Sequence, residues 1–326
     1  MKIISYETRG YEKEYFKELA EKLNVEFVYT EQELNLETIQ FAKGCDAVTV
    51  LNYSQVNAAV LDELKAMQIN CLSARSTGYN HIDIAYAKKI GIKIAHAQYD
   101  SSSVAEFTVM MLLMAIRKVK HALCRGNVND YSLEGLQGKV LKNLTVGVIG
   151  GGKIGTSVIK YLHGFGCRLM VFDAFQNETA KKLAQYVDLD TLYRESDIIT
   201  LHVPLLEETN HMIQKDTLSQ MKNGVVIINC ARGELLNVED LIEGIETGKI
   251  GALGLDVIEQ EDGLYHHDRR TDILKNQQMA YLRQFPNVVM TQHMAFFTDD
   301  AARSMVYCGV KSLVSFIQTG KSEYEV

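Results

Sequence analysis

The stretch LTVGVIGGGKIGTSVIKYLHGFGCRLMVFD, residues 144–173, decides the fold. An apolar run over 145–149 enters a turn with the pattern G-x-G-x-x-G, a helical segment follows, and a second apolar run over 169–172 ends on Asp173. The glycines of the pattern are Gly150, Gly152 and Gly155. The stretch therefore predicts a strand, a glycine-rich turn, a helix and a second strand, which is the order of a dinucleotide-binding unit.

Each part of this stretch suits a dinucleotide. Gly150 permits a tight turn, Gly152 lets a pyrophosphate approach the backbone, and Gly155 lets the helix pack closely on the strand. The helix N-terminus offers free N–H groups and partial positive charge to the phosphates. A carboxylate at Asp173 can accept both hydroxyls of the adenosine ribose. The alternative is a tight turn in an ordinary α/β domain, but it leaves Asp173 unexplained, so we expect NAD as the cofactor.

Length and composition limit the class of protein. The chain has 326 residues, enough for two domains. Apolar residues make up 47% of it, which supports a large core and argues against wholesale disorder. The formal net charge of −7 disfavours nucleic acid or an anionic membrane as the main partner. A small anionic substrate stays possible, because a local Arg can outweigh the global charge.

Cysteine usage and hydropathy indicate a cytoplasmic protein. The six cysteines form no C-x-x-C pair, and no Cys/His cluster has the spacing of zinc ligands, so we expect reduced thiols and no metal site. The N-terminal MKIISYETRG opens a predicted strand and does not resemble a signal peptide. The longest apolar run, 107–116, is too short to span a bilayer, so we expect no membrane partner.

Strand and helix patterns alternate on both sides of residue 144. Strands are predicted over 2–6, 25–29, 47–51, 71–74 and 92–95, and later over 198–203, 225–229, 252–257 and 288–291. Helical patterns separate most of them, which predicts parallel sheets covered on both faces. Ser103 and Glu106 match a capping box for an apolar helix through about residue 122, and such a helix suits a domain or subunit interface. A last helix is expected over 301–318.

Three ionisable residues stand just after predicted strands: Arg232, Glu261 and His293. In open α/β sheets, ligands bind at the carboxyl ends of the strands, so these side chains are candidates for one site. For Arg232 the alternative is a structural ion pair, and for His293 it is a satisfied core histidine.

The sequence resembles the D-specific 2-hydroxyacid dehydrogenases over almost its whole length, and is most similar to the D-lactate dehydrogenase branch, which includes the vancomycin-resistance type. The matching stretches are RSTGYNHID (75–83), TVGVIGGGKIG (145–155), SDIITLHVPL (196–205), INCARGELLN (228–237), GLDVIEQE (254–261) and the segment around His293. We therefore expect an α/β protein with two doubly wound parallel-sheet domains. A Rossmann NAD domain, 101–296, would be inserted in a flavodoxin-like substrate domain, 1–100 and 297–326, with a cleft that closes to exclude water.

The resemblance also implies roles for the three candidates. Arg232 would bind the carboxylate of a 2-oxo acid with its guanidinium fork and polarise the ketone. His293 would protonate the forming alkoxide as hydride arrives from the nicotinamide. Glu261 would hold the imidazole and favour its protonated form.

Substrate and cofactor contacts follow from the same resemblance. The backbone of Thr77 and Gly78 would clamp the carboxylate, and the pocket would be lined by Tyr99, Phe296 and Tyr53. The contacts to NAD would come from Lys153, Ile154, Asp173, Val203, Pro204, Thr209, Cys230, Ala231 and Asp256. Cys230 is thus interpreted as part of a cofactor loop and not as a nucleophile.

Together these features predict an NAD-dependent oxidoreductase that reduces pyruvate to D-lactate, as a cytoplasmic homodimer. One alternative is a dehydrogenase for a larger 2-oxo acid, such as 2-oxoisocaproate, phenylpyruvate or 2-oxoglutarate. The other is a non-catalytic NAD-sensing protein on the same fold.

Overall fold

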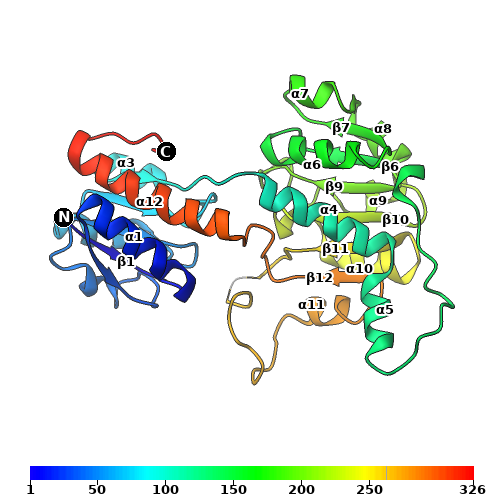
Figure 1. Ribbon diagram of the computed structural model, residues 1–326, viewed down its shortest axis with the longest axis horizontal. Helices are drawn as coiled ribbons and strands as arrows, with labels where there is room; N and C mark the ends of the chain where they lie inside the picture. Colours follow the sequence, from blue (N-terminus) through cyan, green and yellow to red (C-terminus); the bar gives the residue numbers. More distant parts are fainter. Residues whose placement is uncertain (262) are drawn as a thin grey trace. The chain divides into compact units, whose positions relative to one another are not determined.

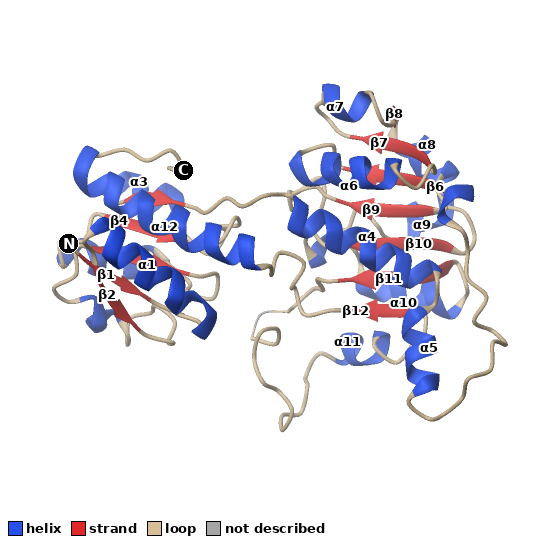
Figure 2. Cartoon of the chain, in the orientation of Figure 1, coloured by secondary structure: helices blue, strands red, loops and turns tan. Residues whose placement is uncertain are grey.

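A computed structural model describes residues 1–261 and 263–326. The chain forms two compact units, Met1–Asp100 with Phe297–Val326, and Ser101–Phe296. Each unit is built around its own parallel sheet (Figures 1 and 2). Two parallel-sheet α/β domains were expected, and this fold class is confirmed.

The first unit contains a five-stranded sheet with the order β2-β1-β3-β4-β5. Its strands are β1 (Lys2–Ser5), β2 (Glu26–Tyr29), β3 (Ala47–Val50), β4 (Cys71–Ala74) and β5 (Lys93–Ala95). All pairs are parallel, and the order 2-1-3-4-5 is that of flavodoxin-like sheets.

Alternate residues of these strands enter two different cores. Ile3 packs with the helices α1 (Lys13–Leu23) and α12 (Asp299–Thr319), whereas Ile4 packs on the side of α2 (Ala58–Ala66) and α3 (Ile84–Ile90). This is the period of two that a strand covered on both faces requires. Figure 1 shows α1 and α12 together on one face of the sheet. The short 3-10 helices of this unit are η1 (Gly10–Glu12) and η2 (Ile39–Ala42).

The second unit contains a seven-stranded sheet with the order β12-β11-β10-β9-β6-β7-β8. Its strands are β6 (Thr145–Ile149), β7 (Arg168–Phe172), β8 (Gln185–Tyr186), β9 (Ile198–Leu201), β10 (Val225–Asn229), β11 (Ile250–Leu255) and β12 (Val288–Met290). Counted from β6, the order is that of a Rossmann sheet with one strand added beyond its edge. Because every pair is parallel, the loops that follow these strands leave the same edge of the sheet.

Helices cover both faces of this second sheet (Figure 2). They are α4 (Ser102–Ile116), α5 (Val119–Gly126), α6 (Lys153–His163), α7 (Glu178–Lys181), α8 (Leu189–Glu195), α9 (Lys215–Gln220), α10 (Val238–Glu246) and α11 (Gln277–Leu282), with the 3-10 helices η3 (Leu141–Asn143) and η4 (Gly233–Leu235). Helix α4 packs against α6 and against β10 and β11. No helix of the described ranges combines the length and the apolarity that a membrane crossing needs.

The expected capping box at Ser103 is wrong. The N-cap of α4 is Ser101, whose side chain makes no capping hydrogen bond, so Ser103 lies inside the first turn. The helix also ends earlier than predicted, because Lys118 has a φ of 53°, in the left-handed region. The chain restarts as α5, where the Nζ of Lys120 donates to backbone carbonyls of Arg283, Phe285 and Val288. These bonds tie α5 to the turn before β12.

Candidate active site

The glycine-rich turn after β6 has the shape that a pyrophosphate needs. Gly150 has a φ of +102°, and a Cβ there would lie 2.5 Å from the carbonyl oxygen of His202. A Cβ on Gly155 would lie 1.8 Å from the carbonyl oxygen of Gly150, so only glycine lets α6 approach the strand this closely. Gly152 is the N-cap of α6, and nothing lies within 4 Å of a Cβ built there. The open N-terminus of α6, with Lys153 and Ile154 in its first turn, fits a phosphate ligand.

Asp173 follows β7 and faces this turn. Its Oδ2 accepts a hydrogen bond from the backbone N of Gly151 at 2.6 Å, and its Oδ1 accepts one from the backbone N of Phe175 at 2.8 Å. A carboxylate has about four acceptor sites, so both oxygens can still accept a ribose hydroxyl. The carboxylate is therefore fixed beside the turn, where the sequence placed the adenosine ribose.

The loops after β9 and β10 carry the other expected cofactor residues. Thr209 closes the first loop, because its Oγ1 donates to the carbonyl of Pro204 at 2.7 Å and accepts from the backbone N of Leu206 at 2.8 Å. Val203 stands next to Pro204 in this loop. Cys230 and Ala231 directly follow β10, and burial raises the pKa of the Cys230 thiol to about 12. A thiol of that pKa is not a nucleophile at neutral pH.

His293 and Glu261 form a hydrogen-bonded pair. The imidazole Nδ1 lies 2.5 Å from the Oε1 of Glu261. The two side chains are 25% and 23% exposed, so the pair is largely shielded but still reachable. The other carboxylate oxygen of Glu261 accepts from the backbone N of Ile258 at 3.2 Å. Since Glu261 takes Nδ1, Nε2 is the ring nitrogen left for a ligand.

The loop that carries His293 is held by Asp256, which is fully buried. The Asp256 carboxylate accepts bonds from the Oγ1 of Thr291 at 2.6 Å and from the backbone N of Met294 and Ala295 at 2.9 and 2.8 Å. Its carbonyl accepts from the backbone N of His293 at 2.7 Å. The sequence suggested Asp256 only as a cofactor contact and gave no sign of this second role.

A second histidine, His266, forms a hydrogen bond to the loop that carries His293. His266 lies 3.1 Å from the carbonyl oxygen of His293 through its Nε2, and since a carbonyl only accepts, that nitrogen carries the proton. The ring of Phe296 stands near both imidazoles, with its centroid 6.4 Å from that of His293 and 6.3 Å from that of His266. Phe296 therefore lies beside the candidate proton donor, and His266 is a neighbour that the sequence analysis missed.

Arg232 follows β10, the strand next to β11. The side chain of Asn229 shapes its turn, since Nδ2 donates to the carbonyl of Arg232 at 2.7 Å and Oδ1 accepts from the backbone N of Ala231 at 3.0 Å. A Cβ on Gly233 would lie 2.2 Å from the carbonyl carbon of Ile258, so this turn packs against the segment that leads to Glu261. Among the described residues Arg232 forms no ion pair, and its Nη1 donates to the carbonyl of Ala231 at 2.7 Å, so the guanidinium keeps further N–H donors for an anion.

In the first unit, three expected substrate residues follow β3 and β4. Tyr53 comes after β3, and the guanidinium carbon of Arg9 lies 5.7 Å from its ring centroid. Thr77 and Gly78 come after β4, where their carbonyl oxygens are bonded to the Nδ1 of His96 at 3.1 Å and to the Oγ of Ser76 at 2.7 Å.

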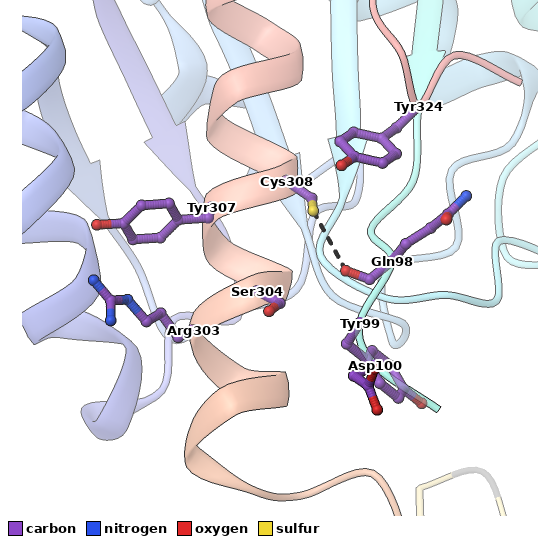
Figure 3. Close-up of a pocket in the computed structure, with 8 residues that line it drawn as sticks. All are labelled: Gln98, Tyr99, Asp100, Arg303, Ser304, Tyr307, Cys308 and Tyr324. Carbon is purple, nitrogen blue, oxygen red and sulfur yellow. Dashed lines mark hydrogen bonds between the residues drawn. The ribbon is translucent and has the colours of Figure 1, made fainter. Parts of the chain in front are cut away.

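Tyr99 lies in a different setting. It lines a cavity of about 440 Å³ together with residues of α12 and the C-terminal segment (Figure 3). The lining residues are Gln98, Tyr99, Asp100, Arg303, Ser304, Tyr307, Cys308 and Tyr324. Within the described part of this unit, the cavity thus does not bring Tyr99 together with Tyr53, Thr77 or Gly78.

Comparison with known proteins identifies the family. Residues 109–295 match the family described as D-isomer specific 2-hydroxyacid dehydrogenase, NAD binding domain. The chain belongs to this family. It is therefore an NAD-dependent oxidoreductase, and the prediction of NAD as cofactor is confirmed together with the resemblance that carried it.

Relatives of this dehydrogenase carry names for different substrates. An aromatic 2-oxoacid reductase of Clostridium sporogenes is 42% identical over 318 residues, covering 97% of this chain and 96% of the relative. A D-lactate dehydrogenase of Escherichia coli is 36% identical over 315 residues, with 96% of each chain covered. The solved structure of a D-2-hydroxyisocaproate dehydrogenase superposes with a TM-score of 0.91 at 31% identity, covering 100% of this chain and 99% of the other.

We predict that Asp173 makes the enzyme selective for NADH over NADPH. A 2′-phosphate would meet a fixed carboxylate, and such like-charge contacts cost several kcal/mol, so kcat/KM should favour NADH by at least about a hundredfold. Asp173→Ser should reduce this preference at least about tenfold. Glu178→Gln, which removes an exposed carboxylate on α7, should leave the preference unchanged. Equal use of both cofactors by the wild type would refute the role of Asp173.

We also predict that Glu261 supports the reduction of the 2-oxo acid through its bond to His293. In the proposed roles His293 gives its proton to the forming alkoxide, and Glu261 holds the imidazole through Nδ1. Glu261→Gln should therefore lower kcat for reduction by about tenfold or more, because it removes the carboxylate of this pair. Glu259→Gln is the matched control, since Glu259 is bonded to His211 instead. An unchanged kcat in Glu261→Gln would exclude this role of Glu261.

Proposed function

We propose that this dehydrogenase reduces a 2-oxo acid to the D-2-hydroxy acid, with NADH supplying the hydride when bound. The observation that carries the proposal is the pair of His293 and Glu261 at 2.5 Å, with Nε2 left to face a ligand. In this proposal His293 donates its proton to the ketone oxygen as the alkoxide forms, and Glu261 holds the imidazole and stabilises its charge. Arg232 binds the substrate carboxylate and polarises the ketone.

The remaining contacts are proposed on the same basis. Thr77 and Gly78 offer backbone groups to the carboxylate, while Tyr53, Tyr99 and Phe296 contact the rest of the substrate. For NAD, the proposed contacts are Gly150, Gly152, Lys153, Ile154, Gly155, Asp173, Val203, Pro204, Thr209, Cys230, Ala231 and Asp256. The unit Ser101–Phe296 thus serves as the NAD domain, and we assign the other unit as the substrate domain, whose proposed contacts are Tyr53, Thr77, Gly78 and Tyr99.

Pyruvate, with D-lactate as the product, is the first substrate we propose. The ring of Phe296 stands beside His293, and a bulky ring there leaves room for a methyl group but crowds an isobutyl or benzyl group. The resemblance to D-lactate dehydrogenases supports the same choice, as does the relative in Escherichia coli.

An aromatic 2-oxo acid is the second candidate. It is favoured by the relatives of Clostridium sporogenes named aromatic 2-oxoacid reductase, which are 42% and 41% identical to this chain. Under this alternative the rings of Phe296 and His266 would contact the aromatic group of the substrate instead of excluding it. The two candidates therefore assign opposite effects to the same ring.

We predict that the wild type prefers pyruvate over phenylpyruvate, 2-oxoisocaproate and 2-oxoglutarate in kcat/KM, measured by NADH oxidation. Phe296→Ala should narrow the gap to phenylpyruvate by about tenfold or more, since one methylene of fit is worth about 1–3 kcal/mol. Phe297→Ala is the control, because that ring packs against Tyr11. A preference of the wild type for phenylpyruvate, lowered by Phe296→Ala, would establish the aromatic alternative.

We further propose a cytoplasmic homodimer that uses α5 and the segment after it. This region exposes large apolar side chains, with exposed fractions of 61% for Leu123, 77% for Tyr131 and 84% for Leu133. Large exposed apolar side chains close together in one segment of the chain are candidates for an interaction site. The sequence analysis suggested the buried helix α4 as the subunit interface. We now propose that the dimer contact lies on the neighbouring and more exposed α5 and the segment after it.

We predict a dimer in light scattering coupled to gel filtration, with twice the mass of the chain. Leu133→Asp should shift the protein toward the monomer at micromolar concentration, because it places a charge in the proposed contact. Leu36→Asp changes an exposed leucine of the first unit and should leave the mass unchanged. A monomeric wild type would refute the proposal.

A further inference from the structure

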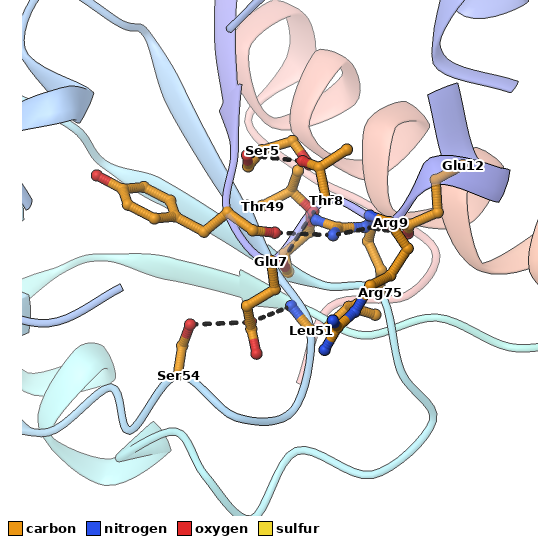
Figure 4. A network of polar contacts seen from close by, with 11 residues as sticks. Ser5, Glu7, Thr8, Arg9, Glu12, Thr49, Leu51, Ser54 and Arg75 are labelled. Carbon is orange, nitrogen blue, oxygen red and sulfur yellow. Dashed lines mark hydrogen bonds and ion pairs between the residues drawn. The ribbon is translucent and has the colours of Figure 1, made fainter. Parts of the chain in front are cut away.

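Glu7 is a buried carboxylate that binds the loop following β3. Only 1% of the residue is exposed. Its Oε2 accepts from the backbone N of Leu51 at 2.6 Å and from the Oγ of Ser54 at 2.8 Å, and its Oε1 accepts from the backbone N of Tyr53 at 2.8 Å. Figure 4 shows the side chain of Glu7 directed at Leu51 and Ser54. One carboxylate therefore binds three of the four residues of the 51–54 loop.

This arrangement is costly to keep. Glu7 has a φ of 55°, in the left-handed region that is unfavourable for a residue with a Cβ. Burial also raises the pKa of Glu7, opposed by the bond from Ser54, the charge of Arg75 and the bonds from Tyr53 and Leu51. Both oxygens already receive an N–H, so an amide group at this position would set a donor against a donor. The loop thus requires two acceptor oxygens at this position, and a glycine would satisfy the backbone without supplying them.

The segment that follows β1 also contacts the ring of Tyr53. The guanidinium of Arg9 lies over that ring, 5.7 Å from its centroid. Tyr53 is therefore held at its backbone N by Glu7 and at its ring by a cation from two residues further along the chain.

A buried ion pair extends this network to the loop after β4. The Oε2 of Glu12 accepts from the backbone N of Arg9 at 2.8 Å, and its Oε1 pairs with the Nε of Arg75 at 2.8 Å. Arg75 is fully buried, donates to the carbonyl of Tyr6 at 2.9 Å, and directly precedes the Ser76–Gly78 segment. Figure 4 shows these side chains converging beside the exits of the strands. The exits of β1, β3 and β4 are thus joined at one edge of the parallel sheet.

We propose that Glu7 is a positioning residue for the substrate: it fixes the 51–54 loop and thereby sets where Tyr53 meets the 2-oxo acid. The inference rests on the proposed function, in which Tyr53 contacts the substrate. It assigns to Glu7 an effect on substrate affinity and none on the cofactor, whose contacts belong to the other unit.

The central test compares Glu7→Gln with the wild type. Glutamine has the size of glutamate but turns one of the two acceptors into a donor, so it must lose the N–H of Leu51 or that of Tyr53. KM for the best 2-oxo acid should rise about tenfold or more, with kcat changed less than about threefold and the Kd of NADH, measured by fluorescence titration, unchanged. Glu14→Gln on α1 removes an exposed carboxylate and should change none of these values.

Two further variants separate positioning from a loss of stability. Glu7→Gly suits the φ of 55° but has no carboxylate, so its KM should rise as in Glu7→Gln even where its Tm is higher. Glu7→Asp keeps the charge on a shorter side chain and should recover part of the affinity. In a Tyr53→Ala background, Glu7→Gln should raise KM by less than about twofold, because the residue it positions is gone.

The outcomes distinguish this inference from the function on which it rests. A wild type that oxidises NADH with none of the 2-oxo acids overturns both. An active wild type with an unchanged KM in Glu7→Gln and Glu7→Gly overturns the inference alone. The inference is likewise overturned if the effect of Glu7→Gln is equally large without the Tyr53 ring, or if it occurs in the Kd of NADH.

Discussion

The place of the candidate proton donor depends on one buried carboxylate. Asp256 accepts bonds from Thr291, Met294 and Ala295, which bracket His293 on both sides. His293 has a φ of 52°, a conformation that costs about 1–2 kcal/mol outside glycine. Hydrogen bonds to a charged acceptor contribute about 1.5–3 kcal/mol each, so the three together outweigh this strain. The loop is thereby fixed in the conformation that brings the imidazole to Glu261.

The first unit uses the same physical arrangement. Glu7 follows β1 as Asp256 follows β11, each carboxylate is buried, and each binds donors from the loop after another strand. Each is also associated with a left-handed residue that is not glycine, His293 in one case and Glu7 itself in the other. A carboxylate suits this task because it has two acceptor oxygens, so it can accept hydrogen bonds from several backbone N–H groups. Such groups lie just after the end of a strand, where the neighbouring strand no longer offers carbonyl acceptors.

Much of this fold could be predicted because its signals are local. The apolar run and glycines of 145–155 fix a strand, a turn and a helix within a few residues, and the structure places all three there. Short elements were not predicted. Strand β8, for example, has two residues and is defined by its pairing with β7. The break between α4 and α5 was not predicted either, because a lysine such as Lys118 does not signal a left-handed conformation, and the bonds that hold α5 come from a turn far along the chain.

The residues of the candidate site show the same difference between local signals and long-range contacts. The proposed cofactor contacts include glycines and helix N–H groups that are neighbours in sequence, so a motif predicts them. The proposed substrate contacts are side chains whose directions are set by distant partners: the carboxylate that binds the backbone of Tyr53 comes from Glu7, 46 residues away, and Tyr99 faces residues of α12. Such long-range contacts produce no periodic pattern and no fixed spacing in the sequence, so the sequence alone does not predict them. Relatives that are 42% and 36% identical over nearly the whole chain carry names for different substrates, which is the result expected when fold and cofactor depend on local motifs and specificity depends on a few long-range contacts.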